Sequence, residues 1–437
     1  MIPARSAGAL ISAGVLLGAT VMAGDSTILN IGLARTDITP EQPVTMAGYA
    51  SRKDLSQGVH DPLSARAIAF EHGSERLVVV STDLIGFYDG TCEPIRDAIL
   101  SECGLRPEQL FLSAVHTHAG PSLGLSSGRA HPNNVAYTKR LKRQLVQVTK
   151  TALAELQPAN LTAARGSSPV GVNRREQITT RDGGTEIRLG RNPSGPMDRE
   201  VQVLVVRRPD DAAPRGILFG YGTHSTALGP RNHVISGDVH GLAEQFVERY
   251  FGEGTIAPGF AGASGNVDPW YRVVPEFRTE RGWIPEPVLL GTMLGEEIVQ
   301  VVAGAGSKDL GGSIAADLQI LELPGNRNDT GESTVPVGLV VTAARVGEAA
   351  FVGLGGEVFN QIGRAIKEAS PFAHTLIITH CNGTAGYLPI LEAYPEGGYE
   401  VRTSPFGPEA AGLVVAEVTR ILHELHDDAS RVASASR

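Results

Sequence analysis

Short apolar runs recur along the chain with amphipathic stretches between several of them, and this alternation limits the folds that the sequence can adopt. The apolar runs have the length and β-branched content of buried strands, and they cover residues 77–82, 110–115, 201–206, 216–223, 337–346, 349–355 and 375–379. The amphipathic stretches repeat apolar residues with helical spacing, and they cover residues 137–156, 239–251, 288–302 and 409–426. Strands that alternate with helices predict an α/β fold.

The predicted strands 337–346 and 349–355 are so close in sequence that they should form a hairpin. An antiparallel pair within an α/β chain indicates a mixed sheet, so we expect a mixed β-sheet core sandwiched by helices. Segments 119–134 and 266–283 are long loops that directly follow apolar runs, where α/β enzymes usually place their sites. We therefore expect the site at strand ends.

The length of 437 residues and a hydrophobic content of 42% allow a large core in one domain or in two tightly joined lobes. The polar segment 325–336 is a candidate for a soft boundary between such lobes. The formal net charge of −9 and the scattered Lys and Arg residues offer no basic surface for a phosphate backbone. The composition therefore argues against nucleic acid as a partner.

The N-terminal residues 1–23 have the features of a secretory signal peptide. Arg5 precedes an uncharged run, and Val21 and Ala23 occupy the small-residue positions of a cleavage site. A membrane anchor or a buried helix is the alternative, but the run is at the short limit for crossing a bilayer. We expect export to the periplasm or the extracellular medium, and a mature chain without a transmembrane segment.

The three cysteines, Cys92, Cys103 and Cys381, are too few for a disulfide scaffold. A helical pattern separates Cys92 from Cys103 and would hold them roughly 16 Å apart at about 1.5 Å per residue, which is beyond disulfide reach. The sequence therefore predicts free, mostly buried thiols.

Histidines follow two of the predicted strands directly. His116 and His118 end the run 110–115, and residues two apart on an extended chain point to the same side. His224 ends the run 216–223 in the same way. Glu357 follows the run 349–355 at the predicted start of a helix, where the positive helix end keeps a carboxylate ionised; an ordinary helix N-terminal glutamate is the alternative.

Ordered motifs from about residue 30 to residue 400 resemble the neutral/alkaline non-lysosomal ceramidase family, in its N-terminal catalytic domain. They are IGLARTDITP with MAGYA (31–50), GVHDPLSARA (58–67), LFLSAVHTHAGP (110–121), GVNRR (171–175), PMDREVQVLVV (196–206), THSTALGPRNHVISGDVHGLA (223–243), GEVFNQIGR (356–364) and CNGTAGYLPILEAYPEGGYE (381–400). Members of this family are zinc amidases that cleave ceramide into sphingosine and a fatty acid. The resemblance implies a catalytic domain over residues 24–430, without the family's further C-terminal β-rich domain.

The resemblance also implies the members of a zinc site. The family's zinc ligands fall on four residues, namely His116, His224, Glu357 and Tyr387. A zinc ion in such a site activates a bound water and polarises the scissile carbonyl. His118 and Arg174 match positions that face the substrate, which implies proton transfer for His118 and stabilisation of the carbonyl or oxyanion for Arg174. Asp238 either orients His224 or caps the helix that follows it.

The sequence departs from the family at the GDVSP motif, whose serine is important for catalysis. The corresponding stretch here is Gly265 to Pro269, where Asn266 replaces the aspartate and Asp268 replaces the serine. A carboxylate cannot donate a proton as a hydroxyl does at neutral pH, so we expect Asp268 to act as a general base. Ser264 is a nearby alternative that requires a shifted backbone.

These observations predict an exported zinc hydrolase that cleaves the amide of an N-acyl, ceramide-like substrate. One alternative is a zinc esterase, lactonase or amidase with a smaller substrate, and another is an inactive zinc-binding protein on the same scaffold. The aromatic residues Trp270, Tyr271, Phe277 and Trp283 follow Asp268 closely. They form either an apolar wall for the substrate or ordinary packing at the rim of a loop.

Overall fold

The computed structural model of the chain describes residues 28–252, 254–270, 286–326 and 335–435. The predicted signal peptide, residues 1–23, lies outside these ranges. Among the described helices, none combines the length and the apolar character that are needed to cross a membrane.

The first layer is a five-stranded sheet covered on one face by two helices. Its elements are β1 (Asn30–Asp37), β2 (Ser64–His72), β3 (Glu75–Thr82), β4 (Leu110–Ala114), β5 (Gln157–Pro158), α1 (Cys92–Cys103) and α2 (Pro132–Ala154), with a 3-10 turn at Pro107–Gln109. The strand order is β4-β3-β2-β1-β5, and of these pairs only β3 and β4 are parallel. Successive side chains of β2 point to opposite faces of this sheet. Ala67 and Ala69 pack with the helices, whereas Ile68 and Phe70 lie on the other face.

The second layer is a four-stranded sheet in the order β11-β10-β9-β6, on which two helices pack. Its elements are β6 (Asn160–Ser167), β9 (Glu200–Arg207), β10 (Pro214–Tyr221), β11 (Gly259–Ala261), α3 (Asp238–Phe251) and α4 (Glu286–Ala303). The inner strands β9 and β10 are almost continuously apolar, since one face meets α3 and α4 and the other meets the centre of the molecule.

The third layer is a four-stranded sheet in the order β13-β14-β15-β17, covered by α5 and α8. Its elements are β13 (Ile314–Leu323), β14 (Val337–Val346), β15 (Ala349–Leu354), β17 (His374–Thr379), α5 (Asn360–Ala369) and α8 (Ala410–Ala435). Short elements complete the described fold, namely β7 (Gly171–Thr179), β8 (Thr185–Asn192), β12 (Val267–Pro269), β16 (Glu357–Val358), β18 (Tyr387–Leu388), α6 (Ala393–Glu396) and α7 (Tyr399–Thr403).

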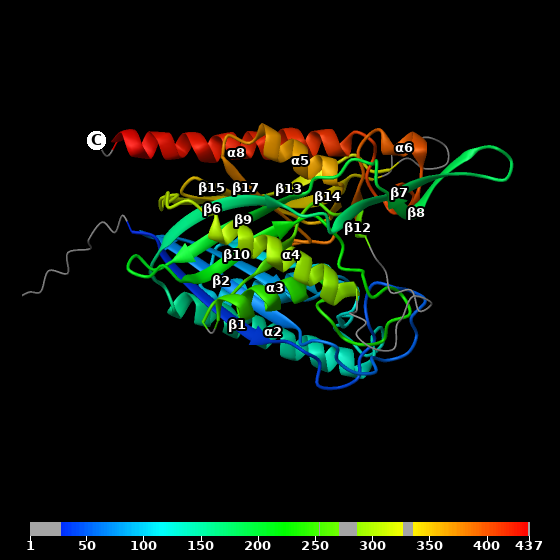
Figure 1. Cartoon of the computed structure of the whole chain (residues 1–437), viewed down its shortest axis with the longest axis horizontal. Helices are drawn as coiled ribbons and strands as arrows, with labels where there is room; N and C mark the ends of the chain where they lie inside the picture. The colour runs from blue at the N-terminus through cyan, green and yellow to red at the C-terminus, as the bar shows by residue number, and fades with distance from the viewer. Residues whose placement is uncertain (1–27, 253, 271–285, 327–334, 436–437) are drawn as a thin grey trace, which may run out of the picture.

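The sheet faces that point away from the helices share one buried core. Phe351 of β15 lies at its centre, with its ring centroid 5.8 Å from that of Phe70 and 6.4 Å from that of Phe111. Helix α8 therefore lies on one side of the molecule and helix α2 on the opposite side, with the sheets between them (Figure 1). The predicted fold class, a mixed β-sheet core sandwiched by helices, is confirmed.

Each of the seven predicted strands and four predicted helices coincides with an element of the structure and extends at most two residues beyond it, and the predicted hairpin is the antiparallel pair β14–β15. Segment 325–336, considered above as a lobe boundary, connects β13 to β14, and these strands pair along their whole length in one sheet. Residues 327–334 of that segment lie outside the described residues. The polar hairpin β7–β8 was not predicted, because its strands are half exposed and carry little apolar periodicity.

The cysteine prediction is confirmed. All three thiols are free, with Cys92 and Cys381 buried and Cys103 partly exposed. Burial raises the pKa of the Cys92 thiol to about 12, so this side chain behaves as a small apolar group.

A buried ion cluster joins the first layer to the second. Arg66 of β2 is 1% exposed, and its guanidinium contacts Glu248 through Nε at 2.8 Å and also contacts Glu244. Asp83 lies 3.7 Å from the same guanidinium, and its carboxylate accepts a hydrogen bond from the backbone N–H of Ser64. Arg66 thus compensates buried carboxylates that come from a loop and from α3, and Arg35 of β1 also pairs with Glu248.

Candidate metal centre

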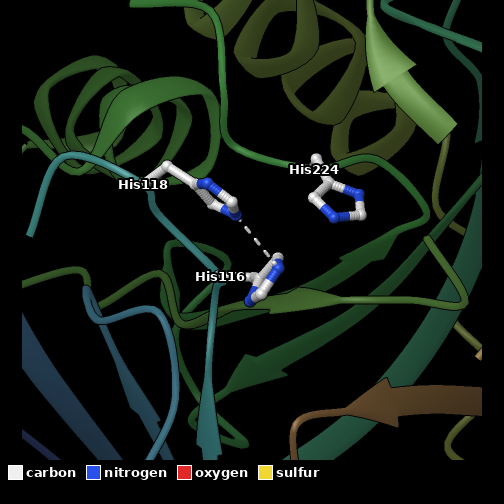
Figure 2. A group of neighbouring side chains, drawn as sticks. All are labelled: His116, His118 and His224. Carbon is white, nitrogen blue, oxygen red and sulfur yellow. Dashed lines mark hydrogen bonds between the residues drawn. The ribbon is translucent and has the colours of Figure 1, made fainter. Parts of the chain in front are cut away.

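His116 lies two residues beyond the end of β4, and its ring is fixed from one side. Its Nδ1 lies 2.7 Å from the carbonyl oxygen of Ile85, which can only accept, so Nδ1 carries the proton and Nε2 keeps a lone pair. The backbone of His116 is left-handed, with φ of +60°. The extended geometry expected for the pair of histidines is therefore wrong, although the rings still meet, with the Nε2 atoms of His116 and His118 at 3.2 Å (Figure 2).

His224, three residues beyond the end of β10, is held in the same manner. Its Nδ1 lies 2.9 Å from the carbonyl oxygen of Ser264 and 3.0 Å from that of Val267, which again leaves Nε2 as the lone-pair atom. The side chain is fully buried. Two backbone carbonyls therefore orient the ring of His224, a role that the sequence analysis considered for Asp238.

Asp238 has a different role. Its carboxylate accepts hydrogen bonds from the backbone N–H groups of Ala227, Leu228 and Val239. It thereby joins the first turn of α3 to the loop that follows His224. This role resembles helix capping, which is one of the two roles considered for Asp238 in the sequence. Burial raises the pKa of Asp238 to about 6.

Glu357 reaches the site from the short strand β16 and not from the first turn of a helix. Strand β16 pairs in parallel with β18, and this pairing sets Glu357 opposite Tyr387. The Oε2 atom of Glu357 lies 3.5 Å from Nε2 of His116 and 3.5 Å from Nε2 of His224. This oxygen is buried and has no hydrogen-bond partner among the described residues.

These distances fit a metal ion. In a tetrahedral zinc site with bonds of about 2.0–2.2 Å, two ligand atoms lie roughly 3.3–3.6 Å apart. The separations of 3.5 Å from Glu357 to each of the two imidazoles match that spacing. A ligand atom of His118 also lies within 4.8 Å of ligand atoms of His116 and His224, so three imidazoles converge (Figure 2). The carboxylate of Glu357 joins two of them. An unpartnered, buried carboxylate oxygen is costly unless a cation compensates it.

The electrostatics keep the donors in their metal-binding forms. Burial lowers the pKa of His118 and of His224, so both rings are neutral at physiological pH. Burial opposes ionisation of Glu357, but the nearby His116 and His224 lower its pKa well below the ordinary value. Burial raises the pKa of Tyr387 well above its ordinary value, so its phenol keeps the proton unless a cation displaces it.

Arg174 is buried in the same site and is held by acidic groups. Its Nη1 lies 3.2 Å from Nε2 of His224, and its Nη2 lies 3.1 Å from the hydroxyl oxygen of Tyr387. Its Nε donates to Glu400 at 2.8 Å, and Glu400 also accepts from Arg175 at 3.0 Å. Arg174 thus presents a fixed positive charge beside His224 and Tyr387.

Asp268 lies between two arginines. Arg174 donates to its Oδ1 and Arg191 of β8 donates to its Oδ2, each at 3.2 Å. A carboxylate engaged on both oxygens is better suited to positioning Arg174 than to removing a proton, so the geometry disfavours the general-base role expected above. The hydroxyl of Ser264 is buried and has no hydrogen-bond partner among the described residues. Tyr271, Phe277 and Trp283, considered as a substrate wall, lie outside the described residues.

The ring of His118 packs against the MAGYA segment (46–50), and the nearby Arg52 holds its backbone. Tyr49 packs edge-on against it at 5.0 Å between centroids, and Arg52 donates to the carbonyl oxygen of His118 at 2.6 Å. Gly48 has φ of +98°, and a Cβ placed on it would lie 2.5 Å from Cγ and from Nδ1 of His118. Only a glycine allows the ring this close to the backbone.

We expect Gly48→Ala to lower turnover by about 10²-fold, since a misplacement of roughly 1 Å has effects of that size. Gly73→Ala is a matched control, because Gly73 also has positive φ (+60°) but nothing lies within 4 Å of an added Cβ. Both variants should lose about 1–2 kcal/mol of stability through backbone strain. Equal turnover of the two variants in the hydrolysis assay would refute the contact between Gly48 and His118 as the cause.

Several site residues were missed by the sequence analysis. His380 directly follows β17 and stacks on His116, which is the same strand-end signal that identified His116 and His224. Tyr88, whose hydroxyl lies 3.4 Å from Oε1 of Glu357, comes from a loop that carries no comparable signal. Arg191 and Glu400 reach the site only because the β7–β8 hairpin and α7 fold against it.

The three layers and the buried group of imidazole and carboxylate donors define an α/β protein with a candidate metal centre. A family model described as "Neutral/alkaline non-lysosomal ceramidase, N-terminal" matches residues 29–268, which is more than half of the chain. The chain belongs to this family. The match includes His116, His118, Arg174 and His224, whereas Glu357 and Tyr387 lie beyond it.

Curated relatives share this region. A neutral ceramidase from Oryza sativa subsp. japonica is 26% identical over 55% of this chain and 31% of its own length. A neutral ceramidase from Mycobacterium tuberculosis is 25% identical over 55% of this chain and 40% of its own length. The chain thus aligns with less than half of the length of either relative.

Solved structures share the fold over most of the chain. A neutral ceramidase from Pseudomonas aeruginosa superposes with a TM-score of 0.71 at 19% identity, covering 90% of this chain and 73% of that one. A structure described as "Ceramidase complexed with C2" superposes with a TM-score of 0.73 at 18% identity, covering 92% of this chain and 76% of that one.

Proposed function

We propose that this protein is a zinc-dependent hydrolase that cleaves the amide of an N-acyl, ceramide-like substrate. The observation that carries the proposal is the unpartnered Oε2 of Glu357, buried 3.5 Å from the lone-pair nitrogens of His116 and His224. His116, His224, Glu357 and Tyr387 would hold the ion. Family membership supports amide hydrolysis, and the ligands, the ion and the substrate are our inference.

The residues around the ligands have the chemistry that amide cleavage needs. Bound zinc would polarise the scissile carbonyl and activate the attacking water. His118, neutral and held beside His116, can transfer a proton from the attacking water to the leaving nitrogen. Arg174 offers N–H donors to the negative charge that develops on the carbonyl oxygen. Asp268 and Glu400 hold this guanidinium in place.

A smaller amide, ester or lactone is the second candidate for the substrate. An apolar groove of about 900 Å³ lies in the described structure beside α5 and α8, but none of the proposed ligands lines it. Arg175 lines this groove, whereas its chain neighbour Arg174 faces the metal site, since alternate residues of β7 point to opposite sides. A long acyl chain bound in the groove would therefore be separated from the metal by β7.

The test is metal analysis of the purified chain together with hydrolysis assays on N-acyl sphingosine, N-acyl amino acids, simple esters and lactones. We expect about one zinc per chain, turnover of N-acyl sphingosine, loss of turnover on chelation and recovery when zinc is restored. Absence of bound zinc would refute the metal site. Zinc without turnover on any substrate would instead favour an inactive binding protein. Turnover of esters or lactones alone would favour the second candidate.

We also propose export of the protein, which rests on the N-terminal sequence. N-terminal sequencing of the protein recovered from outside the cytoplasm should begin near residue 24. A cytoplasmic chain that retains residues 1–23 would contradict export.

A further inference from the structure

His380 is a buried imidazole beside the proposed ligands that no step of the proposed mechanism uses. It directly follows β17, is 2% exposed and has a left-handed backbone with φ of +52°. Asn382, two residues further on, is also left-handed with φ of +56°. Strained backbone of this kind persists only where the surroundings hold it in place.

The surroundings that hold this turn belong to the strand that leads to His116. The side chain of Asn382 accepts a hydrogen bond from the backbone N–H of Leu112 at 3.0 Å and donates to the carbonyl oxygen of Leu110 at 2.6 Å. Both residues lie in β4, whose end leads to His116. The turn that carries His380 is therefore fixed relative to the strand that carries the metal-binding ring.

The ring of His380 lies flat on the ring of His116. The two centroids are 3.8 Å apart and the planes are inclined by 11°. The lone pair of an imidazole nitrogen lies in the plane of its ring, so an ion bound by Nε2 of His116 lies near the plane of that ring. Because the plane of His380 is nearly parallel and displaced, His380 cannot bind the same ion. The Nε2 atom of His380 has no hydrogen-bond partner among the described residues.

We propose that His380 is a positioning residue that holds the imidazole of His116 in its metal-binding orientation by stacking on its face. The carbonyl oxygen of Ile85 fixes His116 within the ring plane through Nδ1, and His380 blocks the remaining freedom, which is tilting out of that plane. This inference rests on the proposed metal site.

The experiment compares three variants of the full chain with the unaltered protein. His380→Phe keeps a flat ring and removes the nitrogens, whereas His380→Ala removes the ring. Ile378→Ala truncates a fully buried side chain two residues earlier in β17, which packs in the central core, and it controls for a general loss of packing. Zinc affinity is measured by competition with a chelating indicator, and the geometry of the site by the visible absorption of the cobalt-substituted protein.

We expect His380→Ala to weaken zinc binding by about 10- to 100-fold, as replacing residues that orient metal ligands does. The cobalt spectrum should change in the same variant. His380→Phe should stay within about threefold of the unaltered protein, and Ile378→Ala should lower thermal stability without weakening zinc binding. Unchanged affinity in His380→Ala would overturn the inference. Equal weakening in His380→Phe would also overturn it, because the role would then belong to a ring nitrogen. Equal weakening in Ile378→Ala would overturn it too, because the effect would then be a general loss of packing. Failure of the unaltered chain to bind zinc would refute the metal site itself. This outcome differs from a failure of the inference about His380, in which the unaltered chain binds zinc.

Discussion

Replacing His116 by alanine is expected to remove the bound metal and, with it, hydrolysis. The free energy of zinc binding to a protein site is about 10–16 kcal/mol, so each of four ligands contributes roughly 3–4 kcal/mol. Losing one ligand should therefore lower the zinc affinity by about 10²–10³-fold. The empty space left by the imidazole would also strand the unpartnered oxygen of Glu357 without a cation. The zinc content of the purified variant and its affinity in a chelator competition measure the effect. His423→Ala, which alters an exposed histidine of α8, is the control and should keep both.

His118→Ala separates two roles within the same group of side chains. The Nε2 atom of His118 lies only 3.2 Å from that of His116, so geometry alone would also allow it as a ligand. If it transfers protons, the alanine variant keeps its zinc and loses turnover. Loss of zinc from this variant would place His118 among the ligands, and retention of zinc by His116→Ala would contradict the proposed site.

The parts of the site that could be predicted from the sequence are those that directly follow strands. His116 and His224 each follow an apolar run, and their place at strand ends is a local property of the chain. His380 carries the same local signal after β17 and could have been found by the same reasoning. The left-handed turn at His116 could not, because it depends on the contacts that the ring makes with the carbonyl of Ile85 and with His118.

The residues that could not be predicted owe their place to contacts between distant segments. Asp268 looked like a base in a loop, and only the fold brings Arg174 and Arg191 to its two oxygens, 94 and 77 residues away. Arg66 carries no signal in the sequence that indicates an ion cluster. Its carboxylate partners Glu244 and Glu248 are 178 and 182 residues away, on a helix of another layer. Apolar periodicity records which face of a strand is buried but not which side chain will lie against it.

The buried ion cluster leads to the second large effect that we expect, which is on stability. Arg66→Met keeps most of the side-chain volume and removes the cation that compensates Asp83 and Glu244, whereas Glu248 keeps its ion pair with Arg35. Breaking a buried ion pair by removing one partner costs about 3–5 kcal/mol, because a buried charge is left without compensation. Arg106→Ala is the control, since Arg106 is half exposed, its ion pairs with Glu75 and Glu108 lie at the surface, and such pairs contribute about 0–1 kcal/mol. Urea unfolding at neutral pH measures both.

The pH dependence of the Arg66→Met effect distinguishes lost charge compensation from lost packing. Burial already raises the pKa of Asp83 and of Glu244 above their ordinary values, and removing Arg66 should raise both further. An acid whose pKa is higher in the folded than in the unfolded state takes up a proton on folding, so its contribution to stability falls as the pH rises from the unfolded to the folded pKa. The variant should therefore lose less stability relative to the unaltered chain at pH 5 than at pH 8. A loss that is the same at both pH values would mean that the methionine fits poorly and that Asp83 and Glu244 do not depend on Arg66 for their charge.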